Sequence, residues 1–486
     1  MHADGAGYWP TKSWRSSTPE QQGMDSGMLA DMLGYIQEQG IRIHSLLVIR
    51  NGYIVTEAYF HPFQQDTEHY LASCAKSFTS ALVGIAVEKG YIENVNHRVL
   101  DYLPSRVVAN QDPRKGDITL EHLLTMTSGL DWPTHGLQEQ VGPQMLGSND
   151  WVQFVLDRPM VEGPGAQFDY NSGGSHLLSA IIQEVTGMDT LTLAQKDLFE
   201  PLGMSVKSWS SDPGGINTGG WGIQMVPRDM ARFGYLYLRK GTWNGRQIIS
   251  DAWVRTSAMQ HIATSYYGYQ YGYQWWVHPT GVYHARGLGG QRIFVLPKQR
   301  MVVTFTSGLN FPAMEEVPEA LLEEFIIPAA KSSESLPENP GLELFDSRIK
   351  TIAQPEPQPA LPLPSLAQRI SGKMYILEDN PYDWRAFVVD FQEEQARLSL
   401  SFGNGSRQVV VGLDGVYRTT QAKPIGFLNG AVALRGSWED SNSFLLSLQF
   451  LNGICFDMRL DFSETDVNIH QLLARRTVEI RGRLSS

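Results

Sequence analysis

Cysteine is scarce in this chain of 486 residues, which holds only Cys74 and Cys455, far apart in the sequence. Two such cysteines exclude a disulfide framework, and neither belongs to a metal-ligand cluster. The twelve histidines are scattered without the spacing of metal ligands, so we expect neither a metal site nor a cofactor. Long apolar runs are also missing: no stretch of 18 apolar residues occurs, and we therefore expect no membrane-spanning helix.

Positive charge is in deficit, with 39 Lys and Arg against 51 Asp and Glu and a formal net charge of −12. This balance argues against nucleic acid as a partner and fits a small-molecule substrate. The amino-terminal stretch MHADGAGYWPTKSW lacks the basic and apolar regions of a signal peptide. We expect either a cytoplasmic protein or a periplasmic or secreted one whose leader has been removed; these patterns leave the oligomeric state open.

Several catalytic motifs are absent as well. The sequence has no G-x-S-x-G nucleophile elbow, no H-E-x-x-H zinc motif, no Walker A loop and no G-x-G-x-x-G dinucleotide loop. These absences argue against the hydrolase, metalloprotease, nucleotide-hydrolysing and dehydrogenase classes that depend on those motifs.

What is present is the composition of a globular protein, 42% hydrophobic and 19% charged, in a chain too long for one ordinary core. We predict a first domain over 1–330, a Pro- and Ser-rich linker over 331–365 and an accessory domain over 366–486. The linker contains QPEPQPALPLP, with five prolines in eleven residues. The last segment is built from short strand-like runs such as AFVVDF and ARLSLSF, which predict a small β-barrel or β-sandwich.

Within 1–330 the predicted elements run from strands to helices and back to strands. In such an α+β pattern the first and last strands can share one antiparallel sheet. Periodicity and turn residues predict a helix over 20–40 capped by Asp25 or Ser26, a hairpin over 45–60 around Asn51-Gly52, helices over 73–89 and 175–186, and strands over 270–278, 283–296 and 300–307.

The stretch Ser73-Cys74-Ala75-Lys76 places a hydroxyl and an amine three residues apart at the head of a strongly apolar helix. This spacing puts both groups on one helix face, where a lysine can activate a serine without any histidine. A helix cap beside a solvated charge gives the same short pattern, so the surrounding segments decide between the two interpretations. Cys74 lies off that face, and we expect it to be a small packing residue.

A second polar stretch, Phe168-Asp169-Tyr170-Asn171-Ser172-Gly173-Gly174, comes just before the predicted helix 175–186. The functional interpretation makes Tyr170 a phenol that relays a proton between Ser73, Lys76 and a leaving group. The alternative is a half-buried tyrosine in a turn. Asn171 and Ser172 supply short polar side chains that we expect to orient the phenol or contact the substrate.

A third stretch, from His284 through Gly287-Leu288-Gly289-Gly290-Gln291, leads into the strand RIFVLP. Glycines at a strand edge, here Gly287 and Gly289, allow a substrate carbonyl to approach the backbone closely. One backbone N–H of this stretch, together with that of Ser73, can form an oxyanion hole. A simple turn or β-bulge is the competing interpretation.

Together these stretches resemble the serine β-lactamase-like superfamily, in the class C β-lactamase-related branch with family VIII carboxylesterases, 6-aminohexanoate-dimer hydrolases and D-aminopeptidases. The resemblance covers about 20–330. It also takes in SLLVIRNGYIVTEAYF, ITLEHLLTMTSGLDW, PGAQFDYNSGGSHLLSAIIQEVTG, LFEPLGM, MVPRDMARFGYLYLRKGTWNGRQIIS and GLGGQRIFVLPKQRMVVTFTSG.

The resemblance implies a central antiparallel sheet flanked by helices, as in β-lactamases and penicillin-binding proteins, with a small all-β domain after it. It also implies that Ser73 is the nucleophile, Lys76 its base and Tyr170 a second general acid/base. The backbone N–H groups of Ser73 and Leu288 would form the oxyanion hole. The expected reaction is hydrolysis of small ester or amide bonds through a covalent acyl-enzyme.

Two departures from the family pattern favour an esterase. The usual Tyr-x-Asn reads Tyr170-Asn171-Ser172, and Gly287-Leu288-Gly289 stands where a Lys-Thr-Gly strand motif is usual. The cation that pairs with a β-lactam or peptide carboxylate is therefore missing, unless His284 or Arg286 replaces it. A D-amino-acid peptidase, amidase or β-lactamase acting on cell-wall-like substrates is the alternative enzyme, and a non-catalytic ligand-binding relative is the third hypothesis. The aromatic run YYGYQYGYQWW at 266–276 either lines the cleft or packs the sheet.

Overall fold

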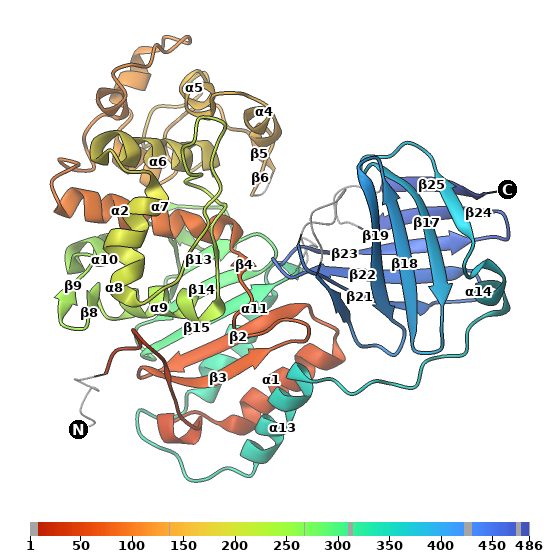
Figure 1. Ribbon diagram of the computed structural model, residues 1–486. Helices are drawn as coiled ribbons and strands as arrows, with labels where there is room; N and C mark the ends of the chain where they lie inside the picture. The colour runs from red at the N-terminus through yellow and green to blue at the C-terminus, as the bar shows by residue number, and fades with distance from the viewer. Residues whose placement is uncertain are drawn as a thin grey trace.

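The computed structural model describes residues 8–135, 137–266, 268–309, 314–421, 430–472 and 478–485. It shows a larger α+β body, coloured red to green in Figure 1, and a second body of blue strands beside it. Among the helices so described, none has both the length and the apolar character needed to cross a membrane.

The larger body is built around a nine-stranded sheet in the order β1-β3-β2-β15-β14-β13-β12-β11-β10. Only β1 and β3 pair in parallel; the other neighbours are antiparallel. The amino-terminal hairpin thus lies against the last strand, as the order of the predicted elements indicates. The strands are β1 Arg15–Ser16, β2 Ile43–Arg50, β3 Tyr53–Tyr59, β10 Ile262–Ala263, β11 Gln270–Tyr271, β12 Trp276–Val277, β13 Tyr283–Gly287, β14 Gln291–Leu296 and β15 Met301–Ser307.

Both faces of this sheet are covered, which is why every residue of β2 is buried. Alternate side chains of a strand point to opposite faces, and Leu47 and Ile49 accordingly join one core while Leu46 and Val48 join the other. The first core includes the helices α2 Ala75–Glu88, α6 Ser172–Thr186 and α9 Pro227–Leu238. The second includes α1 Ser26–Glu38 and α13 Gly341–Ala353, seen on the far side of the sheet in Figure 1.

The helix predicted over 20–40 is shorter in the structure. α1 begins at Ser26 because the Asp25 side chain accepts hydrogen bonds from the backbone N–H groups of Gly27 and Met28. Residues Glu20–Gln22 form a separate 3-10 helix. The helix predicted over 175–186 begins earlier, at Ser172, and ends at Gly187, whose φ of 68° suits glycine.

The single strand predicted over 270–278 is wrong. The structure has two short strands, β11 and β12, which pair with each other. Gln274, between them, has a φ of 62°, so the chain reverses direction there. Its amide reaches into the helical layer, where Nε2 donates to the carbonyls of Leu123 and Leu124. Tertiary hydrogen bonds have therefore overridden the local strand propensity.

The predicted linker 331–365 contains a helix. α13 packs along α1 and buries Phe345 and Ile352 in the second core, while the stretch between Gln354 and Pro364 forms neither helix nor strand. The segment is thus partly anchored to the larger body before it reaches the second one.

The second body is an all-β unit of ten strands from β16 to β25, preceded by the short helix α14 Ser365–Ile370. β19 pairs with both β18 and β21, so the sheet closes on itself as a barrel rather than a sandwich. The strands are β16 Met374–Leu377, β17 Trp384–Phe391, β18 Gln395–Phe402, β19 Gly405–Gly412, β20 Arg418–Thr420, β21 Val432–Trp438, β22 Ser443–Phe450, β23 Cys455–Phe462, β24 Asp466–Leu472 and β25 Val478–Leu484.

The two bodies meet beside the short strand β4 His69–Tyr70. The backbone N–H of Tyr70 donates to the carbonyl of Asn452, in the turn between β22 and β23, at 2.8 Å. Gly453 in the same turn lies so close to His69 that an added Cβ would come 2.0 Å from its ring. Arg42 of the larger body forms an ion pair with Asp457 of the barrel. A turn of the barrel therefore contacts the strand that leads directly to Ser73.

Candidate active site

Ser73 and Lys76 lie together at the start of α2. Ser73 is in the 3-10 helix Ala72–Cys74 and Lys76 in the first turn of α2. The amine Nζ lies 3.1 Å from Ser73 Oγ, within hydrogen-bond distance. Lys76 is only 2% exposed, whereas Ser73 is partly accessible. The spacing read from the sequence thus gives a hydroxyl in contact with a buried amine.

The surroundings of the Lys76 amine are neutral. Nζ is also 2.8 Å from Ser172 Oγ and 3.1 Å from the carbonyl oxygen of Gly220. No ion pair of Lys76 with a carboxylate occurs in the part of the chain that the structure describes. A side chain at position 220 would crowd this amine, since a Cβ there would lie 3.2 Å from Nζ. The amine is held by three neutral oxygens that do not neutralise a positive charge.

Tyr170 completes the group from the segment before α6. The Lys76 amine lies 4.7 Å from the centroid of the Tyr170 ring. The ring itself is 5% exposed and stacks on Trp276 with centroids 6.1 Å apart. Ser73, Lys76 and Tyr170 therefore converge although they come from segments almost a hundred residues apart.

The backbone before Ser73 is strained. Ala72 has a φ of 47°, a region that residues with a Cβ seldom adopt and that costs on the order of 1–3 kcal/mol. Gly287, at the end of β13, packs against this segment: a Cβ on Gly287 would lie 2.3 Å from the carbonyl oxygen of Leu71. The close approach explains the glycine at 287 and holds the end of β13 beside Ser73.

The turn after β13 carries the predicted oxyanion residue Leu288, whose side chain is 58% exposed. Gly289 and Gly290 have φ values of 80° and 86°, so this tight turn requires glycine at both positions. Gln291 anchors it, because its Nε2 donates to the carbonyls of Ser307 at 2.7 Å and Leu288 at 3.2 Å. The turn is thus fixed beside the Ser73 segment, with an apolar side chain directed outward.

The two residues after Tyr170 have internal partners. Asn171 Oδ1 accepts a hydrogen bond from the backbone N–H of Gly174 at 2.8 Å and so caps α6. Ser172 is buried, and its hydroxyl contacts the Lys76 amine rather than open space. Their expected contact with substrate stays a prediction, while the structure gives Asn171 a capping role and Ser172 a place next to the amine.

Neither His284 nor Arg286 replaces the missing cation. Both project from β13 to the face opposite Ser73, because Ala285 between them belongs to the first core. Arg286 pairs with Glu319 at 3.0 Å, and His284 lies 3.6 Å from the same carboxylate. Burial, reinforced by the nearby Arg292 and Arg286, lowers the pKa of His284 well below its usual range.

Three parts of this site carry no sequence motif. The carbonyl of Gly220 contacts Lys76, and the ring of Trp276 supports Tyr170. The carboxylate of Glu139 accepts hydrogen bonds from the backbone N–H of Ser172 and from the indole of Trp132. Each is brought in by a loop or a short strand remote in sequence; only Trp276 carried a signal, as the last residue of the aromatic run at 266–276.

The described residues of the aromatic run at 266–276 pack in two places, and their expected contact with substrate stays a prediction. Tyr269, Tyr271 and Trp276 gather with Tyr170 in a small cluster, whereas Tyr273 and Trp275 pack into the main core. Burial raises the pKa of Tyr271 well above its usual value, and Tyr170 adds to this effect. Cys74 is a packing residue as predicted: it is fully buried, and burial raises the pKa of its thiol to about 12.

The fold and the site together define a serine hydrolase of the β-lactamase and penicillin-binding-protein type. The model of the Beta-lactamase family matches residues 20–324, more than half of the chain, and the protein belongs to that family. Proteins to which the chain is similar include a 6-aminohexanoate-dimer hydrolase.

Individual relatives are distant. The chain is 23% identical over 288 residues to the 6-aminohexanoate-dimer hydrolase of Paenarthrobacter ureafaciens, covering 55% of this chain and 73% of that protein. The solved structure of EstCE1, a hydrolase with promiscuous acyltransferase activity, covers 63% of this chain and 99% of its own at a TM-score of 0.52 and 17% identity. The octameric penicillin-binding protein homologue of Pyrococcus abyssi covers 94% of this chain and 100% of its own at a TM-score of 0.50 and 16% identity.

Proposed function

We propose that the protein cleaves small ester or amide bonds through a covalent acyl-enzyme, with esters as its preferred substrates. The observation that carries this proposal is the 3.1 Å contact between the partly accessible Ser73 hydroxyl and the buried amine of Lys76. A hydroxyl is a weak nucleophile until a neighbouring base takes its proton. Lys76, held by neutral oxygens only, is the group beside Ser73 that can do so.

In the acylation step, Ser73 Oγ attacks the substrate carbonyl carbon while the neutral Lys76 amine accepts the Oγ proton. The carbonyl oxygen becomes an oxyanion, which the backbone N–H groups of Ser73 and Leu288 stabilise. Collapse of this intermediate breaks the bond to the leaving group, which takes a proton from Tyr170. The proton held by Lys76 then restores Tyr170, whose ring lies beside the amine.

Deacylation repeats these steps with water. The Lys76 and Tyr170 pair takes a proton from the incoming water, and the resulting hydroxide attacks the acyl carbon. The bond to Ser73 Oγ breaks, the acid leaves, and the proton returns to Ser73. No step requires a histidine.

The preference for esters follows from the charges around Ser73. Substrates of the peptidase and β-lactamase type carry a carboxylate, which needs a cation at the position now held by Gly287-Leu288-Gly289. His284 and Arg286 face the opposite side of the sheet, and the side chain exposed on this turn is the apolar one of Leu288. Amides remain the second candidate, because the relative from Paenarthrobacter ureafaciens is a 6-aminohexanoate-dimer hydrolase.

The test is hydrolysis of p-nitrophenyl butyrate by the wild type, Ser73→Ala and Ser80→Ala. Ser80 is a matched control on the same helix, since its buried hydroxyl has no hydrogen-bond partner in the structure. We expect Ser73→Ala to lose roughly 10³-fold or more in kcat/KM and Ser80→Ala to stay near the wild type. Trapping of a butyryl adduct on the wild type, detected by intact mass, would identify the acyl-enzyme. Equal turnover by wild type and Ser73→Ala would overturn the assignment.

A further inference from the structure

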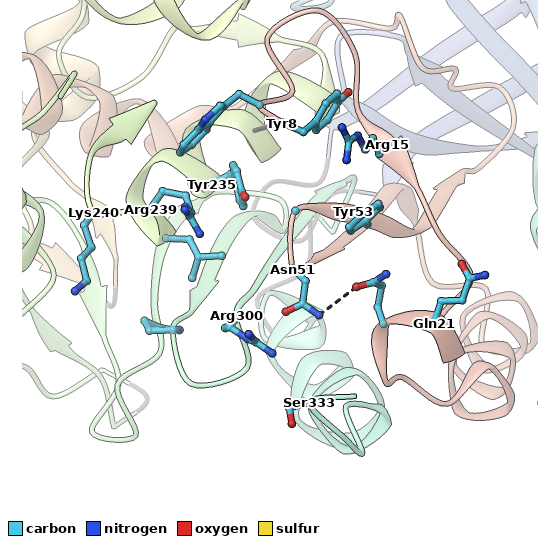
Figure 2. A pocket seen from close by; sticks show the side chains of 15 residues that line it. Tyr8, Arg15, Gln21, Asn51, Tyr53, Tyr235, Arg239, Lys240, Arg300 and Ser333 are labelled. Carbon is cyan, nitrogen blue, oxygen red and sulfur yellow. Dashed lines mark hydrogen bonds between the residues drawn. The ribbon is translucent and has the colours of Figure 1, made fainter. Parts of the chain in front are cut away.

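A cavity of about 450 Å³ lies where β2 turns into β3 and β14 turns into β15. Figure 2 shows it between the amino-terminal segment, the β2–β3 turn and the end of α9. Its volume falls within the range of pockets that hold small molecules, roughly 300–1,000 Å³. This cavity is separate from the Ser73 site and plays no part in the proposed hydrolysis.

The cavity is at the other end of the sheet from Ser73. β14 starts at Gln291, which anchors the Leu288 turn, and finishes at Leu296, just before the cavity-lining Pro297. A strand advances roughly 3.3 Å per residue, so these two ends are on the order of 20 Å apart. A ligand of a few hundred cubic ångströms cannot occupy both places at once.

Positive charge is concentrated around the cavity. Arg15, Arg239, Lys240 and Arg300 line it, and no acidic side chain is among its described lining residues. None of the four takes part in an ion pair within the ranges that the structure describes. Such a concentration is unexpected in a chain whose formal net charge is −12.

Two of these cations are positioned by aromatic rings instead of carboxylates. The Arg15 guanidinium lies 3.6 Å from the centroid of the Tyr8 ring, and that of Arg239 lies 5.3 Å from the Trp9 ring. Stacking of this kind orients a guanidinium while leaving its N–H groups available for another acceptor. Tyr53 and the amide of Asn51 add further polar groups to the wall, as Figure 2 shows.

A fifth cation lies behind this wall. Arg50 is 5% exposed, and its terminal nitrogens donate to the carbonyls of Gly23 and Ser332, neutral acceptors that do not balance its charge. Burial and the proximity of Arg300 lower the pKa of Arg50. Arg300, which lines the cavity, thus places a like charge near the buried Arg50, and a bound anion would offset that repulsion.

We propose that this cavity binds a small polyanion, a molecule that carries two or more phosphate or carboxylate groups. Arginine side chains match both groups through paired N–H donors. The size of the cavity favours a small molecule, and the net negative charge of the chain disfavours an extended polyanion such as nucleic acid.

The experiment is isothermal titration of the full chain with inorganic pyrophosphate and, separately, with citrate. We expect at least one probe to bind and its affinity to weaken as salt is raised from about 50 to about 300 mM, because exposed charges are then screened. A preference for pyrophosphate identifies a phosphorylated ligand, and a preference for citrate identifies a polycarboxylate. Absence of binding by both probes at low salt would overturn the proposal.

Arg300→Gln is the diagnostic variant, with Arg397→Gln as its control. Both arginines are exposed and both changes alter the net charge equally, but Arg397 lies on β18 of the barrel, away from the cavity. We expect Arg300→Gln to weaken binding about tenfold, Lys240→Gln less, and Arg397→Gln not at all. Equal affinities for Arg300→Gln and Arg397→Gln would contradict the proposal. Ser73→Ala should bind the probe like the wild type, so failure of the proposed hydrolysis and failure of this site are distinguishable.

Discussion

Two groups of buried cations lie on opposite faces of the same sheet, and their partners differ. On one face the Lys76 amine contacts the oxygens of Ser73, Ser172 and Gly220, all neutral. On the other face Arg286 and Arg292 share the carboxylate of Glu319, at 3.0 and 2.6 Å. The Lys76 amine thus has hydrogen-bond acceptors but no ion pair among the described residues, whereas the carboxylate of Glu319 fixes two arginines and ties strands to a helix.

The comparison also answers whether His284 or Arg286 replaces the missing cation, a question that the sequence left open. His284 and Arg286 are close to Gly287 in sequence, but the alternation of the strand directs them away from Ser73. A residue close in sequence to a site contributes to that site only if its side chain points to the same face of the sheet.

The largest effect is expected from removal of the Lys76 amine, which forms no ion pair among the described residues. Lys76→Met keeps much of the side-chain volume but deletes the proposed base, and we expect kcat/KM for p-nitrophenyl butyrate to fall roughly 10²- to 10⁴-fold. Stability should change little, since no charged partner is left behind. Steady-state kinetics and thermal unfolding measure the two effects, with the exposed Lys207→Met as control. A strong loss of stability with full activity in the folded fraction would reverse the assignment.

On the face of the sheet that holds Glu319, we expect a loss of stability rather than a loss of activity. Glu319→Gln leaves the buried Arg292 without its carboxylate partner and Arg286 with the carboxylates of Glu315 and Glu316; loss of one partner of a buried pair typically costs about 3–5 kcal/mol of unfolding free energy. Glu324→Gln, nearby in sequence but exposed, should cost nothing measurable. Urea denaturation quantifies both variants. Equal midpoints for the two would show that the buried pairs contribute no stability.

A third kind of buried titratable group is a histidine that stays neutral, in contrast to the Lys76 amine among neutral oxygens and to the arginines paired with Glu319. His44 Nδ1 and His69 Nε2 are 2.8 Å apart at the contact with the barrel turn, near Arg42. Burial lowers the pKa of His69 to about 4 and that of His44 well below its usual value. The unfolded imidazoles bind protons below about pH 6.5, whereas folded His69 does so only near pH 4.

As the pH is lowered from about 6.5 to about 4, the free energy of unfolding should therefore decrease. His69 alone should lower the free energy of unfolding by about 2 kcal/mol at pH 5. Urea denaturation across this pH range measures the slope. His69→Gln should flatten it, and His135→Gln, at an exposed position, should leave it as it is. If His69→Gln left the slope unaltered, protonation of His69 would not be the cause of the pH dependence.

The smallest effect is expected at Ser172. Loss of its hydrogen bond to Lys76 in Ser172→Ala should lower kcat/KM about tenfold, the value of one hydrogen bond to a charged or proton-exchanging group. Because the effect acts through the amine, Ser172→Ala should add almost nothing in a Lys76→Met background. A tenfold loss that persists in that background would mean that Ser172 contacts the substrate directly.

Much of the fold was readable from local patterns. The apolar periodicity and Gly90 predict α2, the Asn51-Gly52 turn predicts the β2–β3 hairpin, and Gly187 marks the end of α6. The strand-like runs predict an all-β unit after the proline-rich stretch. Other features were not readable: Gln274 divides a predicted strand because its amide reaches the α3 segment Leu120–Leu124, a contact set by tertiary structure.

The sequence by itself determined which chemistry is available, because a hydroxyl and an amine three residues apart on a helix must lie on one face. Only the tertiary structure decided what surrounds that pair. Gly220, Glu139 and Trp276 reach the site from distant loops and strands, the pleat of β13 turns its cations away, and the barrel turn meets β4. Local spacing follows from helix geometry, whereas the partners of a buried group depend on how the whole chain closes around it.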